Sequence, residues 1–182
     1  TLQFTLNASA TNTLVNSAMQ QIAYSNSSDA PPASAQINWT FNDGNSGSQG
    51  SGGALTATGS TTVTITGVND APTLTNLSGD SLSYNEGAGA VVIEQGANAL
   101  VADIDSSNFD TGTLTVSIPS GGDSAEDVLS IRNQGTGAGQ IGVSGSTISY
   151  EGTAIGTFTG GSNGTSLVIT LNSSADATTV TA

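Results

Sequence analysis

Apolar and polar residues alternate along most of the chain, which is the pattern of β-strands that turn one face toward a core. The alternation is clearest at residues 35–41, 61–66 and 114–118. Clusters of glycine, asparagine, aspartate and serine separate such stretches, as turn residues do. Further strands are predicted at residues 2–6, 82–85, 90–94, 98–102, 127–132, 139–143, 147–150, 154–158 and 167–171. Many short strands with frequent turns indicate an all-β fold, an antiparallel β-sandwich.

One stretch near the start breaks the alternation. Thr11-Asn12-Thr13 is a run of residues suited to cap a helix, and apolar side chains recur at helical spacing after it. These side chains are Leu14, Val15, Ala18, Met19 and Ile22. We expect a short helix here, packed on the sandwich.

Two polar stretches interrupt the strands. Residues 44–53 contain no apolar side chain, which predicts a flexible loop or a hairpin tip. Residues 67–72, Gly-Val-Asn-Asp-Ala-Pro, end a strand in a short polar run followed by proline. The second stretch is the better domain boundary.

A segment at the start of the chain returns near its end. Residues 2–10 recur as residues 167–175 at a constant offset of 165 positions, and Thr13 and Val15 recur as Thr178 and Val180. A fixed offset is the sign of a tandem repeat. We therefore expect residues 1–70 to be the C-terminal part of one sandwich repeat and residues 71–182 the N-terminal part of the next. We expect such a chain to be a cut from a larger protein. One sandwich would then borrow strands across the cut, close on itself, or exchange strands with a neighbour in a fibre.

Charge narrows the classes of partner. The chain has 14 acidic residues, one base (Arg132) and a formal net charge of −13. Nucleic acid and anionic membrane surfaces would repel it, so neither is an expected partner, and cations are the natural counter-charge. No segment suited to membrane insertion is present in the sequence.

Missing residue types exclude several kinds of site. Without Cys there are no disulfides or thiolate metal sites, and without His there is no usual nucleophilic triad or zinc site. Acidic pairs alone are common in so acidic a chain, so we expect no enzyme. Rigidity outside the cell would then come from hard divalent cations held by oxygen ligands.

The boundary region carries a resemblance. The runs 64–72 (Thr-Ile-Thr-Gly-Val-Asn-Asp-Ala-Pro), 83–87 (Ser-Tyr-Asn-Glu-Gly) and 101–106 (Val-Ala-Asp-Ile-Asp-Ser) resemble the cadherin-like, bacterial Ig-like tandem repeats of giant secreted bacterial adhesins. The resemblance implies an Ig/cadherin-like β-sandwich that binds calcium at the joints between repeats. It places the junctional calcium ligands at Asn69, Asp70, Glu86, Asp103 and Asp105.

Physical reasoning from the residues points to the same ion. Calcium takes six to eight oxygen ligands, so carboxylates must converge from several segments. Asp103 and Asp105 lie two apart on an extended stretch and share a face, where they repel unless a cation intervenes. Asp43 and Asp110 are further candidate ligands, with a role in a turn as the alternative for each. A second acidic cluster at Asp123, Glu126 and Asp127 is interpreted as a solvated loop.

These observations favour a structural extender repeat of an extracellular or cell-surface bacterial adhesin or fibre, as found in biofilms, rigidified by calcium. Its partners would be neighbouring copies of the same repeat. The alternative is a ligand-binding adhesion module that recognises a surface glycan or a protein through its loops. The low aromatic content of 4% disfavours the alternative.

Overall fold

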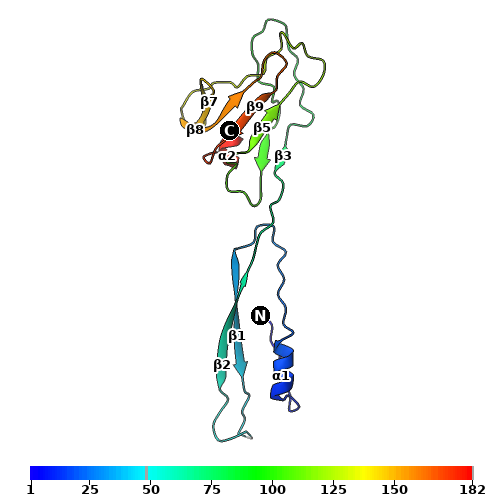
Figure 1. Cartoon of the computed structure of the whole chain (residues 1–182), viewed down its shortest axis with the longest axis vertical. Helices are drawn as coiled ribbons and strands as arrows, with labels where there is room; N and C mark the ends of the chain where they lie inside the picture. Colours follow the sequence, from blue (N-terminus) through cyan, green and yellow to red (C-terminus); the bar gives the residue numbers. More distant parts are fainter. Residues whose placement is uncertain (48, 182) are drawn as a thin grey trace. The chain divides into compact units, whose positions relative to one another are not determined.

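The computed structural model describes residues 1–47 and 49–181, which divide into two compact units. Unit 1 is Thr1–Gly67 and unit 2 is Val68–Ala182. Every strand pairing in the described residues is antiparallel, and helices are few and short, so the predicted all-β class is confirmed (Figure 1). The expected assignment of residues 1–70 and 71–182 to successive repeats stays a prediction.

Unit 1 contains one helix and one hairpin. Helix α1 (Asn12–Met19) begins after Thr11, whose side chain accepts a hydrogen bond from the Leu14 N–H group at 3.4 Å, as an N-cap does. Strands β1 (Ser34–Asn42) and β2 (Thr56–Thr64) pair along their whole length. The hairpin tip falls in the predicted loop 44–53, of which Ser48 lies outside the described residues.

Two expectations for unit 1 are wrong. Residues 2–6 form no strand, because no other described segment of unit 1 pairs with them in a ladder. Helix α1 forms as predicted but buries no side chain, and Leu14 is 59% exposed. A strand or an amphipathic helix needs an opposing surface, and unit 1 does not supply one.

Unit 2 holds two antiparallel sheets. Strands β3 (Thr73–Thr75) and β4 (Leu100–Ala102) form a short pair. The larger sheet has the strand order β5-β9-β8-β7-β6. Its strands are β5 (Thr113–Val116), β6 (Ile141–Ser144), β7 (Thr147–Tyr150), β8 (Thr153–Thr159) and β9 (Leu167–Leu171). Helix α2 (Ala177–Val180) follows β9 directly.

The core lies on the larger sheet. Ile148, Ile155 and Ala175 are buried together, and Leu167 is buried nearby. Half-buried apolar side chains surround this cluster, from Ile131, Ile141, Tyr150, Phe158, Ile169, Leu171 and Val180. All of these residues belong to unit 2, so the core that the structure describes is confined to that unit.

The strand predictions for unit 2 are confirmed where a neighbouring strand exists. Strands were expected at 98–102, 114–118, 139–143, 147–150, 154–158 and 167–171, and each region contains one. Residues 82–85, 90–94 and 127–132 form none, so those predictions are wrong. Their side chains alternate as in strands, yet no ladder of successive backbone bonds joins them to another described segment. Leu129 makes a backbone bond to Gly161, but a single bond is not a ladder.

The 165-residue recurrence is repeated in the local structure. Asn7 and Asn172 each accept a hydrogen bond from the N–H group two residues later, at 2.9 and 2.8 Å. Each also closes a turn through its carbonyl, to Ala10 and Ala175 at 3.0 and 2.9 Å. Helices α1 and α2 then begin at positions that differ by the same 165 residues. The same turn and helix start are therefore built twice.

Burial separates the two copies of this motif. Leu167 is 5% exposed and Ala175 is fully buried, whereas the equivalent Leu2 is 69% exposed and Ala10 is also exposed. In unit 2 the segment pairs with β5 and β8, and in unit 1 it pairs with nothing described. No helix in the described residues is long and apolar enough to cross a membrane.

Candidate functional site

Three of the predicted calcium ligands meet at the end of the β3–β4 pair. Strand β4 ends at Ala102, opposite Thr73, so the residues that follow β4 and precede β3 lie at the same end of the ladder. The Asp70 N–H group donates to Asp105 Oδ2 at 3.1 Å. The pairing of the two strands thus places Asp70, Asp103 and Asp105 at one end of the ladder, where Asp70 contacts Asp105 through its backbone N–H group.

Asp103 organises the loop after β4. Its Oδ1 accepts hydrogen bonds from the N–H groups of Asp105 at 3.2 Å and Ser106 at 3.1 Å. Desolvation raises the pKa of Asp103, but its interactions with Asp105 and Ser106, including the hydrogen bonds from their backbone N–H groups, outweigh it and lower the pKa overall. Asp103 therefore keeps its negative charge close beside a second carboxyl group.

The remaining ligands implied by the resemblance lie differently. Asn69 is adjacent to Asp70 and donates from Nδ2 to the Asp70 carbonyl at 2.8 Å, which turns its amide along the chain. Glu86 is exposed in a turn that the Ala88 N–H group closes onto the Asn85 carbonyl at 3.1 Å. No hydrogen bond between described residues joins Glu86 to the Asp70, Asp103 and Asp105 group.

Asp43 has a role in the hairpin of unit 1. Its Oδ1 accepts hydrogen bonds from the N–H groups of Leu55 at 2.9 Å and Asn45 at 3.2 Å. Its own N–H group donates to the Leu55 carbonyl at 3.1 Å. The bond from Leu55, followed by that from Asn45, lowers the pKa of Asp43. The carboxylate closes the base of the hairpin loop, which matches the turn role considered for it.

Asp110 likewise lies in a turn. The Gly112 N–H group closes this turn onto the Phe109 carbonyl at 2.9 Å. Phe109 and Thr111 donate to the carbonyls of Ala175 and Leu171 at 2.7 and 3.2 Å, so the turn is fastened to the end of β9. No described hydrogen bond directs Asp110 toward Asp103 or Asp105.

The oxygen atoms of these side chains are ligands that a hard cation prefers, but they do not surround a common point. Asp103 uses Oδ1 and Asp105 uses Oδ2 for backbone N–H groups, which leaves the second oxygen of each carboxylate. Within the described residues, no three acidic side chains lie close enough together to hold a metal ion. A calcium ion would have to draw these groups together or take further ligands from outside them.

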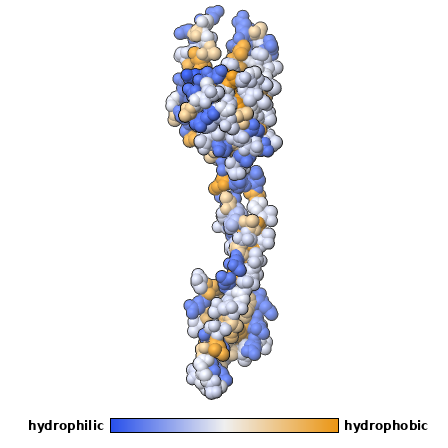
Figure 2. Space-filling view, turned by 90° about the vertical axis from the view of Figure 1, so that its left-hand side faces the viewer, coloured by the Kyte–Doolittle hydropathy of each residue, from blue (hydrophilic) through white to orange (hydrophobic). Residues whose placement is uncertain are grey.

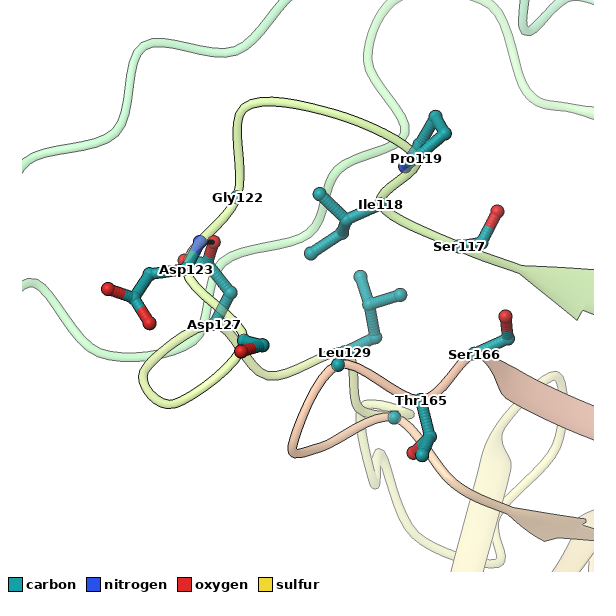
Figure 3. Close-up of a pocket in the computed structure, with 12 residues that line it drawn as sticks. Ser117, Ile118, Pro119, Gly122, Asp123, Asp127, Leu129, Thr165 and Ser166 are labelled. Atoms are coloured by element: carbon teal, nitrogen blue, oxygen red, sulfur yellow. Dashed lines mark hydrogen bonds between the residues drawn. The ribbon is translucent and has the colours of Figure 1, made fainter.

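A cavity of about 360 Å³ lies elsewhere in unit 2, beside the second acidic cluster (Figure 3). Ile118 and Leu129 line it, with Asp123 and Asp127 at one side. Asp127 Oδ2 accepts from the Asp123 N–H group at 2.7 Å, and Asp123 Oδ1 accepts from that of Ala125 at 2.8 Å. These carboxylates stabilise their own loop, in keeping with the interpretation of this cluster as a loop.

Sequence reasoning missed Glu94. Its Oε1 atom is shielded from solvent and has no hydrogen-bond partner among the described residues. A shielded carboxylate oxygen without a donor is unfavourable, which makes this position unusual in an otherwise solvated set of acids. Nothing in the sequence around Glu94 signals it, because shielding depends on how the loop of residues 90–96 folds back.

Comparisons of the chain with models of protein families, with curated protein sequences and with solved structures found no match.

Proposed function

We propose that this chain is a structural extender repeat of a large secreted bacterial adhesin or extracellular fibre. The observation that carries the proposal is the 165-residue recurrence, which extends from the sequence to the hydrogen bonds of the turn and the helix cap. A module that exists in consecutive copies acts by its length and stiffness.

The proposal includes a two-layer β-sandwich as the architecture of the repeat. The five-stranded sheet would form one layer, and β3, β4 and further antiparallel strands would form the other, as in an Ig/cadherin-like repeat. The confinement of the described core to one side of unit 2 fits a layer that is only partly covered. Strands from a neighbouring repeat would complete it.

Calcium would stiffen the joint through the end of the β3–β4 pair. Asp103 and Asp105, with Asn69 and Asp70, would supply oxygen ligands just after the boundary between the units, and Glu86 would join only by moving. Without the ion the carboxylates repel, and with it they hold the joint at a fixed angle. Sites of this kind in extracellular modules have dissociation constants on the order of 10⁻⁴ to 10⁻³ M.

The test compares two double variants of equal charge change. Asp103→Asn with Asp105→Asn removes the proposed site, and Asp123→Asn with Asp127→Asn is the matched control within the same unit. Calcium titration, followed by calorimetry and by melting temperature, should show saturable binding and stabilisation in the wild type and the control but not in the site variant. Magnesium and sodium chloride at matched ionic strength separate coordination from screening.

Two results would contradict the calcium proposal. One is an equal response of both double variants to calcium, which would make the effect a general neutralisation of charge. The other is no change in melting temperature when a chelator is added to the wild type.

A further inference from the structure

The β1–β2 hairpin of unit 1 has one apolar face that is only half-buried: Ala35, Ile37 and Trp39 are partly exposed and none is fully buried. Ala35, Ile37, Trp39 and Phe41 alternate along β1, and the pairing sets Ala57 and Val63 of β2 on the same face. The other face carries only polar side chains, from Gln36, Asn38, Thr40, Thr58, Ser60, Thr62 and Thr64. No described residue of unit 1 is buried, and Phe41 is 40% exposed.

Such a hairpin is incomplete on its own. An isolated two-stranded hairpin is at best marginally stable, and a sheet with one apolar face must bury it against another layer. Trp39 does have a hydrogen bond, from Nε1 to Thr61 Oγ1 at 2.9 Å, so its ring is held on this face. The hairpin therefore needs a second layer to cover its apolar face.

Unit 2 has an open apolar surface of matching character. Leu74 on β3 and Leu100 on β4 are exposed on opposite faces of their ladder, because Leu74 pairs with Val101 and Leu100 with Thr75. The large apolar side chains of residues 82–93 are exposed as well. That segment has no ladder partner in the described structure, although its alternation predicts strands. The exposed apolar side chains between β3 and β4 along the chain are Leu74, Leu82, Tyr84, Val91, Val92, Ile93 and Leu100. Figure 2 shows that both units leave apolar surface open to solvent.

The recurrence identifies what covers this surface. Helix α2 occupies the position of α1 in the repeat, and the segment that follows α1 is the one that holds the hairpin. Helix α2 packs against β4, and Val180 at its end packs on the core cluster. In the next copy of the repeat, the equivalent of residues 18–67 would therefore emerge beside β4 and its exposed Leu100.

Charge favours the same arrangement. Unit 1 contains two acidic residues, Asp29 and Asp43, and no base, whereas unit 2 contains twelve acidic residues and Arg132, a net charge of −11. Two copies of unit 2 would repel each other strongly. Unit 1 is the part of a second copy that can approach unit 2 at the least electrostatic cost.

We propose that unit 1 of a second copy of this sequence docks on residues 74–101 of unit 2, with Ile37, Trp39 and Phe41 covering exposed apolar side chains of this region, Leu100 of β4 among them. The interface is head to tail, because the two surfaces differ, and it propagates from copy to copy. It depends on the repeat character of the proposed function but not on calcium.

The experiment extends the full chain in register. Residues 18–67 are appended after Ala182, since position 18 of the next repeat is position 183 of this one. Hydrogen exchange in the presence of a chelator should show slower exchange at residues 74–101 in the extended chain than in the parent chain, with a higher melting temperature. Unchanged exchange at residues 147–159 confirms that unit 2 itself stays folded.

Two variants of the appended hairpin, numbered as in the parent chain, make the test specific. Trp39→Asp puts a charge on the apolar face and should abolish the added protection. Asn38→Asp puts the same charge on the polar face and should preserve it. Loss of protection in both variants, or added protection outside residues 74–101, would overturn the proposed surface.

Separate chains provide a second readout. The 182-residue protein should self-associate with rising concentration in sedimentation, and Trp39→Asp, unlike Asn38→Asp, should keep it monomeric. A monomer at every concentration, together with no added protection in the extended chain, would overturn the proposal. Protection of residues 74–101 by an added glycan, without self-association, would overturn it too. A failed calcium titration would leave these results unchanged, so the two proposals are tested separately.

Discussion

Both helices begin after an N-cap residue whose side-chain oxygen accepts a backbone hydrogen bond, a threonine in one helix and an aspartate in the other. Thr11 and Asp176 occupy equivalent positions, both have extended backbone geometry, and each accepts a hydrogen bond from the N–H group three residues later. An N-cap needs only a short side chain with an acceptor oxygen, so threonine and aspartate serve equally. Asp176 adds a reciprocal bond, because the Thr179 hydroxyl accepts from the Asp176 N–H group at 2.9 Å.

Asp176 should make the stability of unit 2 depend on pH. The Thr179 N–H bond lowers its pKa against the opposing effect of desolvation. A carboxyl group with a lowered pKa in the folded state stabilises fully above its unfolded value, here 3.8, and loses this effect as pH falls through the folded value. Asp176→Ala should therefore lower the melting temperature more at neutral pH than well below pH 3.8.

Circular dichroism melts at the two pH values check this prediction. Asp176→Asn is the matched control, because it keeps an acceptor oxygen but cannot titrate. It should retain most of the stability of the wild type at neutral pH. An alanine variant with the same deficit at both pH values would contradict an electrostatic part in this cap.

At the scale of elements, the alternation of side chains predicted strands wherever the chain provides a neighbour. It placed β1, β2 and the strands of the larger sheet correctly, but it also predicted strands at residues 2–6 and 82–85 that have no described partner. It missed β3, whose three residues are defined only by their pairing with β4. A ladder is a property of two segments, and a pattern in one segment cannot report the other.

Only part of the candidate site could be predicted from the sequence. Asp103 and Asp105 were predicted to share a face of an extended stretch, whereas β4 ends at Ala102 and the two residues lie in a bend that Asp103 closes through the Asp105 N–H group. The bond from the Asp70 N–H group to Asp105 depends on the pairing of β3 with β4, which the sequence did not indicate. Asp43 and Asp110 could not be assigned from the sequence, since a carboxylate beside glycine suits a turn and a metal site equally. The hydrogen bonds to Asp43 and the fastening of the Asp110 turn to β9 show their local roles.

Gly161 and Gly59 differ in whether their surroundings require a glycine. At Gly161, where φ is +86°, an added Cβ atom would overlap the carbonyl oxygen of Leu129, and the Leu129 N–H group donates to the Gly161 carbonyl at 2.7 Å. At Gly59 of β2 an added Cβ would meet nothing within 4 Å, and φ is not positive. One glycine is required by its neighbours and the other is not.

Gly161→Ala should destabilise unit 2 by about 1–3 kcal/mol, through backbone strain and displacement of Leu129. Gly59→Ala should be neutral or stabilise the hairpin by up to about 1 kcal/mol, because alanine restricts the unfolded chain. Urea unfolding of both variants measures the difference. Equal effects of the two substitutions would show that the approach of Gly161 to Leu129 does not matter to stability.

At the scale of the whole molecule, the two units differ in what holds them together. Every residue that is buried in the described structure lies between Gly142 and Ala175, and unit 1 has none. Unit 2 can fold around Ile148 and Ile155, whereas unit 1 has only backbone pairing and a few side-chain bonds. The free energy of local opening follows the apolar contacts that opening breaks, so it should be far smaller in unit 1.

Hydrogen exchange of the dilute 182-residue chain should therefore separate the units. The amides of β1 and β2 should exchange at least about tenfold faster than those of β7, β8 and β9, although both sets form regular antiparallel ladders. Ile148→Ala is the matched perturbation: it should speed exchange in the larger sheet and leave the hairpin unchanged. Equal protection of the two sets in a chain shown to be monomeric would mean that the apolar face of the hairpin is already covered within one molecule. Protection of β1 and β2 that rises with concentration would instead show that a second copy provides the cover, since only association depends on concentration.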